Sequence, residues 1–146
     1  MYHNNNKYTW IDYQQLEAWG IDEDTFNTQV DKNMDPLLDN SRIETVKTES
    51  NATLAYFETD LAELKSALLF SKHLKDKVFP IIGFPIYCVL PVRDFCYMFN
   101  DQDKDELIGL LGQTVLNEYQ QSGYEITTEI IKISEDGIEA IVKYKA

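Results

Sequence analysis

The segment that constrains this fold most runs from Phe79 to Asn100, reads FPIIGFPIYCVLPVRDFCYMFN, and is the densest apolar stretch of the 146-residue chain. It holds three of the four prolines, both cysteines and one of the two arginines. Aromatic and β-branched residues dominate it, and the prolines separate apolar runs, as is typical of core strands. It predicts two strands, over 86–90 and Phe95–Asn100, joined by the connection 91–94. The prolines and the Arg-Asp pair argue against a membrane helix of the same length.

Length and composition predict a single domain over residues 1–146, with residues 1–8 as a flexible polar tail. A chain with 44% hydrophobic and 12% aromatic residues can bury a sizeable core without a metal or a disulfide framework. The opening MYHNNNKYTWID lacks the apolar region of a signal peptide. We therefore expect a cytoplasmic protein.

The two cysteines, Cys88 and Cys96, are too few for a disulfide framework. Free, buried thiols in a reducing compartment fit this number. If the central hairpin closes around Val92 and Arg93, the two thiols lie one register step apart, on opposite faces of the sheet.

The net charge of −12 is unevenly distributed along the chain. Residues 1–60 hold 12 acids and 4 bases, residues 61–100 hold 3 and 5, and residues 101–146 hold 10 and 4. Nucleic-acid binding needs a basic face, and Arg42 and Arg93 are the only arginines, so we expect no direct contact with DNA or RNA. The acidic flanks fit either a solvated surface or a basic partner.

Local patterns predict four elements before residue 60. They are helices over Tyr13–Trp19 and 23–38 and strands over Arg42–Lys47 and 52–58. Asp12 and Asp22 are the expected N-caps, Gly20 ends the first helix, and Pro36 argues against the last turn of the second. The second helix carries one apolar stripe, formed by Phe26, Val30, Met34 and Leu37.

The segment after residue 60 fits two patterns. Leucines at 61, 64 and 68 lie at helical spacing and favour one helix over 60–74. The alternative is a strand over 64–70 followed by a helix over 71–78.

The C-terminal part predicts a helix and a hairpin. An acidic segment over 101–106 leads into a helix that ends near Gln121, and its apolar face consists of Leu107, Ile108, Leu111, Val115 and Tyr119. Gly109 and Gly112 inside it each cost roughly 1 kcal/mol relative to alanine, which indicates close packing against the sheet. A hairpin then joins strands over 124–134 and 138–144, and the face of Ile138, Ala140, Val142 and Tyr144 is predicted to be buried. The predicted class is α+β: a mainly antiparallel sheet of about six strands, with N-terminal helices and two further helices packed on it.

No residues show catalytic or metal-binding spacing, so we expect no enzymatic activity, no cofactor and no metal. The histidines are His3, in the tail, and His73, on a lysine-rich segment, and neither forms a familiar triad or zinc set with the two cysteines. The acidic segment DQDKD over 101–105 imitates an EF-hand loop. Glu106 and Gly112 stand where that loop needs a glycine and a bidentate glutamate, so the acids are better explained as the start of a helix.

Arg93 and Asp94 form the most informative charged pair. Beside a buried hairpin they could clamp a ligand, or they could serve a turn, in which the carboxylate accepts backbone amides and the guanidinium bridges to another carboxylate. Together with Asp101, Asp103 and Asp105 they are our candidates for contact with a ligand or partner.

Four short motifs follow one another along the chain. They are WIDYQQLEAWGIDED over 10–24, SALLF over 66–70, LPVRD over 90–94 and YEIT over 124–127. In this order they resemble the YtpQ-like family of uncharacterised bacterial proteins, which has a W-G-I/V-[SD]-E-E opening and a central P-S-R-D element, where this chain has Val92 in place of the serine. The resemblance implies a strand over 66–70 ahead of a helix. It implies no function.

Three functions are compatible with these features. We expect a non-catalytic intracellular protein-binding or adaptor module, which has a protein partner and no membrane association. The alternative is an acidic inhibitor or immunity-type protein that occupies a basic surface of a nucleic-acid-handling protein, since the flanks are strongly acidic. The third is an enzyme with a site around Arg93, Asp94 and His73.

Overall fold

The computed structural model describes residues 2–4, 7–9 and 11–145 and is built on a six-stranded antiparallel sheet of order β3-β4-β6-β5-β7-β8. The strands are β3 (Arg42–Lys47), β4 (Thr53–Glu58), β5 (Ile86–Val92), β6 (Phe95–Asn100), β7 (Glu129–Ser134) and β8 (Gly137–Lys143). The helices are α1 (Tyr13–Trp19), α2 (Glu23–Asn40), α3 (Lys65–Leu68), α4 (Leu74–Ile82) and α5 (Lys104–Gln121), and a 3₁₀ turn, η1 (Ala62–Leu64), precedes α3. The predicted α+β class is confirmed.

Strand β5 forms the centre of the sheet and is buried at all seven positions. It pairs with β6 on one side and with β7 on the other, so the predicted central hairpin is confirmed. The connection shortens to Arg93 and Asp94 because β5 continues to Val92. Pro91 lies within a register irregularity between Val89 and Val92, where its missing N–H interrupts no regular ladder.

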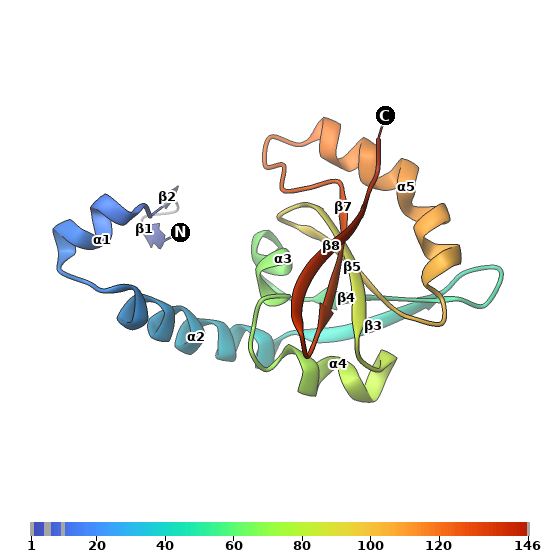
Figure 1. Ribbon diagram of the computed structural model, residues 1–146, viewed down its shortest axis with the longest axis horizontal. Coiled ribbons are helices and arrows are strands. Elements are labelled where there is room, and N and C mark those ends of the chain that lie inside the picture. The colour runs from blue at the N-terminus through green and yellow to red at the C-terminus, as the bar shows by residue number, and fades with distance from the viewer. Residues whose placement is uncertain (1, 5–6, 10, 146) are drawn as a thin grey trace.

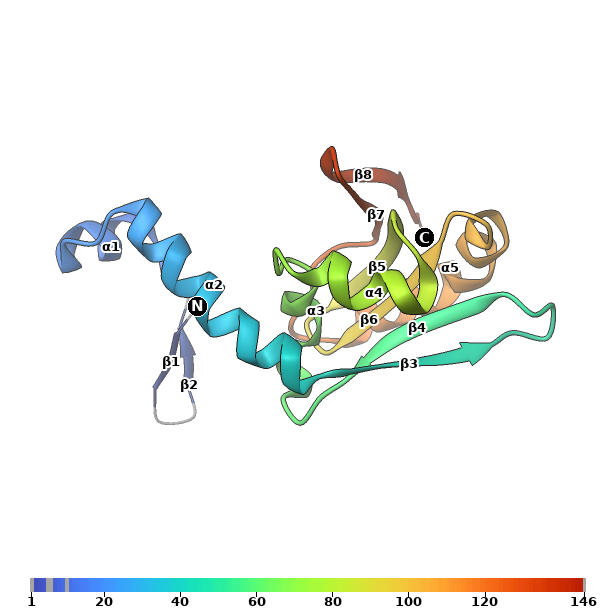
Figure 2. The same cartoon turned by 90° about the horizontal axis from the view of Figure 1, so that it is seen from below.

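Helices cover both faces of the sheet (Figures 1 and 2). Apolar side chains of α3, α4 and the end of α2 fill one core, and they include Leu38, Leu68, Leu74, Val78 and Ile82. Helix α5 fills the other core with Leu107, Leu111 and Val115. Alternate residues of β5 point into the two cores, and each fully buried leucine or valine contributes about 1.5–3 kcal/mol to the free energy of unfolding.

Cys88 and Cys96 both belong to the core under α4, so their predicted placement on opposite faces is wrong. The observed register pairs Cys88 with Met98, and Cys96 lies two residues from Met98 and therefore on the same face. A shift of one residue moves a side chain to the other face, which explains the error. Both thiols are free, and burial raises the pKa of Cys88 to about 12 and that of Cys96 well above its usual value.

Residues 61–82, all of which the structure describes, form helical turns and no strand, contrary to the strand expected over 66–70. Ser66 holds α3 against the central hairpin, because its hydroxyl donates to the Val92 carbonyl at 2.8 Å and its amide donates to the Arg93 carbonyl at 3.1 Å. The single helix over 60–74 is also wrong, since a turn separates α3 from α4.

Strand β8 does not bury the face predicted from its alternating residues. Ile138 is 56% exposed and Val142 is 44% exposed. The pairing with β7 shifts between Ile130 and Ile131, which leaves Ile141 as an extra residue in β8. Ile141 and Tyr144 consequently pack towards the core under α5.

The two glycines of α5 have different surroundings. A Cβ atom on Gly112 would lie 3.1 Å from the ring of Tyr144, whereas one on Gly109 would meet no atom within 4 Å. The predicted close approach is therefore confirmed at Gly112 and wrong at Gly109. Tyr144 is fixed there because its hydroxyl donates to the Ile108 carbonyl at 2.7 Å, and burial raises its pKa to about 12.

The N-terminal part begins with a hairpin in which β1 (Tyr2–Asn4) pairs antiparallel with β2 (Lys7–Thr9). The flexibility predicted for residues 1–8 stays a prediction, because residues 1, 5 and 6 lie outside the described residues. Helix α1 and the first turns of α2 project away from the sheet and its covering helices (Figures 1 and 2). Helix α2 continues through Pro36 to Asn40, so the expectation that it ends at Leu38 is corrected.

We predict opposite outcomes for alanine at the two glycines. Gly109→Ala should raise the free energy of unfolding by about 1 kcal/mol, since it gains helix propensity and meets open space. Gly112→Ala should give no net gain, because the added methyl crowds the Tyr144 ring. Chemical denaturation of both variants measures the difference, and equal gains at both positions would contradict the packing of Tyr144.

We also predict that neither thiol reacts in the native protein. At pH 8 a thiol with a pKa of about 12 is ionised to roughly one part in 10⁴, and the thiolate is the reactive form. Iodoacetamide labelling followed by mass spectrometry should therefore give no adduct under native conditions and two adducts in denaturant. Fast native labelling of either cysteine would show that the core under α4 opens readily.

Candidate functional site

The most distinctive surface of the molecule is the projecting segment 11–33, here called the arm, which comprises α1 and the first part of α2. It exposes large apolar side chains that a core would normally take up. Tyr13 is 75% exposed, Trp19 is 49% exposed and Val30 is 39% exposed. These residues stand on an element that points away from the sheet (Figure 2).

Local chemistry gives the arm its shape. The Asp12 carboxylate accepts the amide of Gln15 at 2.9 Å, and the Gln15 side chain accepts the amide of Asp12, which completes a capping box. Gly20, with φ +65°, ends α1 in the left-handed conformation, as predicted. Leu16 and Phe26 line a hollow of about 220 Å³ between α1 and α2.

The predicted apolar stripe of α2 divides between two environments. Met34 and Leu37 pack against the core under α4, next to the buried Leu38. Val30 and Phe26 lie one and two turns before Met34, in the part of α2 that belongs to the arm, and Val30 is exposed. The sequence pattern showed that these residues share a face, but nothing in it indicated that the core ends near Met34.

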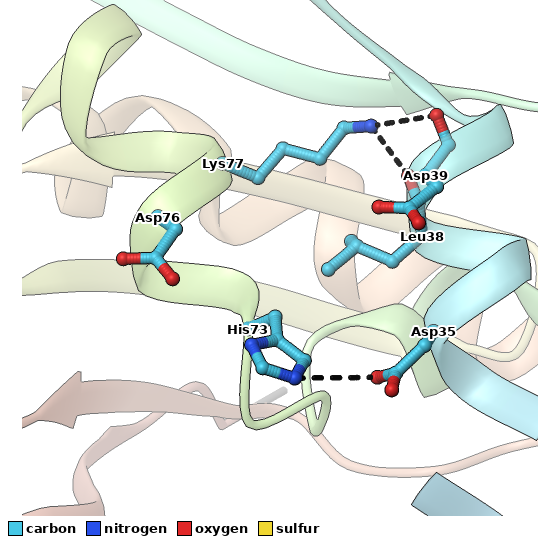
Figure 3. A pocket seen from close by; sticks show the side chains of 6 residues that line it. All are labelled: Asp35, Leu38, Asp39, His73, Asp76 and Lys77. Atoms are coloured by element: carbon cyan, nitrogen blue, oxygen red, sulfur yellow. Dashed lines mark hydrogen bonds and ion pairs between the residues drawn. The ribbon is translucent and has the colours of Figure 1, made fainter. Parts of the chain in front are cut away.

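Two side-chain pairs and a lysine clamp α2 to the start of α4. Lys72 Nζ lies 3.2 Å from Asp31 Oδ2. His73 Nε2 lies 3.8 Å from Asp35 Oδ1 (Figure 3). Lys77 donates to the carbonyls of Leu38 and Asp39, at the C-terminus of α2. Helix α2 has no basic residue in its own last turn, so Lys77 supplies the positive charge that this end of a helix favours.

Between α2 and α4 lies an open hollow of about 490 Å³ (Figure 3). It is lined by Asp35, Leu38, Asp39, His73, Asp76 and Lys77. Asp35 Oδ1 is buried and accepts no hydrogen bond from the residues that the structure describes, because His73 is too distant for one. Among the residues that the structure describes, no group of three or more histidines, cysteines or acids is placed to hold a metal ion. The hollow lies between the two helices that the clamp joins.

The sequence-predicted contact residues lie at two ends of the central hairpin. Arg93 and Asp94 form the turn that precedes β6, whereas the acids from Asp101 onwards follow its last residue. Six residues of strand separate the two groups by about 20 Å, so they do not form one site. The Arg93 guanidinium lies 3.6 Å from the centre of the Tyr124 ring, and Asp94 is exposed.

Two of the three predicted acids make local hydrogen bonds. Asp101 accepts the hydroxyl of Tyr87 at 2.7 Å and lies 3.1 Å from Lys104 Nζ, and the hydrogen bond from Tyr87 is the main reason that its pKa is lowered. Asp103 accepts the amide of Thr53 at 2.8 Å and so ties α5 to β4. Asp105 lies in the first turn of α5, where the helix dipole favours an acid. None of these contacts requires a ligand.

The fold defines an α+β protein with a projecting, partly apolar helical arm. Comparison with known proteins adds no family, since no family model, curated protein or solved structure matches the chain. The resemblance to the YtpQ-like family stays a prediction, although the strand that it implied over 66–70 is wrong. None of the helices that the structure describes is long and apolar enough to cross a bilayer.

We predict that the Lys77 contact stabilises the end of α2. Lys77→Met keeps the aliphatic stem but removes the charge from the helix C-terminus, which should lower the free energy of unfolding by about 0.5–1 kcal/mol. Lys32→Met, at an exposed position of the same helix, is the matched control and should change it by less. Urea denaturation compares the two variants, and an equal loss in both would argue against the clamp.

Proposed function

We propose that this chain is a non-catalytic, cytoplasmic protein-binding module that contacts its partner through the arm. The observation that carries the proposal is the exposure of Tyr13, Trp19 and Val30 on helices that project from the sheet. Tyrosine and tryptophan are enriched at the energetic centres of protein interfaces, where they bury a large apolar area with few rotatable bonds.

The clamp between α2 and α4 supports this function by preorganising the arm. Lys72 pairs with Asp31, and Lys77 donates to the carbonyls of Leu38 and Asp39, so α2 leaves the core in a defined direction. A binding element that is already ordered loses less conformational entropy when it binds. The enzymatic alternative has weaker support, because Arg93 lies over Tyr124 while His73 faces Asp35 between α2 and α4.

A second candidate is the acidic inhibitor or immunity-type protein, which would occupy a basic surface of a nucleic-acid-handling partner. The charge of −12 and its concentration in residues 1–60 and 101–146 favour it. Such a partner would lose its nucleic acid when this chain binds. Displacement of labelled DNA or RNA from the isolated partner would favour the inhibitor, and simultaneous binding of both would exclude it.

The test of the binding module is an affinity pull-down from lysate of the source organism, eluted with a salt gradient and read by mass spectrometry. The double variant Tyr13→Ser/Val30→Ser should reduce recovery of the partner about tenfold, because it removes apolar area from the arm. Leu110→Ser/Ile138→Ser is the matched control: it changes two apolar residues outside the arm, each 56% exposed, and should leave recovery of the partner unchanged.

Circular dichroism and thermal melting establish that all these variants are folded. A partner that the arm variant retains as well as the wild-type chain would contradict the proposed contact surface.

A further inference from the structure

We propose that the arm binds a protein groove with an apolar floor and a rim of lysine or arginine side chains. This inference rests on the proposed function and specifies the chemistry of the partner. It follows from two properties that the arm combines: exposed apolar side chains and a dense negative charge.

The charge of the arm is high for its length. Residues 11–33 contain six acids and one base. Asp31 is paired with Lys72 of the body, but Glu17, Glu23 and Asp24 are exposed. Asp22 also stays ionised near neutral pH, since the amide of Thr25 donates to its carboxylate and lowers its pKa. A partner must therefore compensate several carboxylates around the apolar contact.

The same charge argues against a second copy of the chain as the occupant. Two arms packed side by side would bring their helix axes to about 8–10 Å. That separation is within the Debye length of about 10 Å at 0.1 M salt, so the acids of the two arms would repel each other. Phosphates of nucleic acid or of an anionic membrane would be repelled for the same reason.

The apolar contact has the form of a helix laid into a groove. Phe26 and Val30 are one turn apart on α2, and the stripe continues to Met34, which already packs against the core of the domain. A groove that receives Val30 would therefore lie next to the domain. Recognition by residues spaced along one helix face is a recurrent mode of partner binding.

Photo-crosslinking can identify the protein that contacts the arm. Tyr13→p-benzoylphenylalanine places a photoreactive aromatic side chain at the most exposed of the arm's large apolar positions, where solvent leaves room for its second ring. The protein joined to it in lysate is identified by mass spectrometry, purified, and titrated with the unmodified chain at 50, 150 and 500 mM salt. We expect a crosslinked protein other than this chain, whose affinity falls about tenfold or more over that range.

Charge variants then test the rim directly. Glu23→Gln/Asp24→Asn removes two acids from the arm and should weaken binding about tenfold at low salt while flattening the salt dependence. Glu118→Gln/Glu139→Gln removes the same charge from exposed sites on α5 and β8 and should change the affinity less than about twofold.

The outcomes separate this inference from the function on which it rests. A crosslink to a second copy of this chain would contradict the proposed basic rim. The rim is also contradicted if Val30→Ser weakens binding while neither salt nor Glu23→Gln/Asp24→Asn changes the affinity. In that last case the arm is still the contact surface and the proposed function stands. Both proposals fail if no protein is crosslinked to the arm. They also fail if neither Val30→Ser nor Glu23→Gln/Asp24→Asn changes the affinity of the complex.

Discussion

The structure depends on the complete burial of strand β5. A central strand that is buried on both faces needs apolar elements packed on both sides of the sheet. Helix α4 packs on one face of this sheet and helix α5 on the other. Two further contacts help to hold these covers in place. The Ser66 hydroxyl bonds α3 to the end of β5, and the Tyr144 ring packs against α5 at Gly112. The neutral, apolar middle of the sequence is thus the middle of the folded domain.

Helix α2 connects this core to the surface that we consider functional. At its C-terminal end, Lys77 donates to the Leu38 carbonyl and the Leu38 side chain packs in the core. Towards its N-terminal end, Val30 is exposed to solvent. One amphipathic helix therefore packs into the core at its C-terminal end and presents apolar side chains to solvent towards its N-terminal end. An arm built in this way can present apolar side chains without weakening the domain, because the residues that it exposes are not part of the core.

Much of the fold could be predicted from the sequence, and several of the errors have a common cause. The helix caps at Asp12 and Asp22 and the central hairpin followed from residue types that act over a few positions. The faces of Cys88 and Ile138 could not be predicted, because a one-residue change in pairing or a bulge reverses them. The candidate site was missed for a similar reason: the stripe through Val30 was visible, but where the core stops along α2 was not.

Outside residues 61–82, the sequence by itself indicated which segments become helices or strands and where most of them begin and end, because caps, turns and periodicity act locally. Only the tertiary structure decided which apolar residues are covered. Val30 and Leu38 belong to the same helix, yet one is exposed and the other buried, and the difference lies in whether α3 and α4 are within reach. Burial is a property of long-range contacts, and no local pattern specifies them.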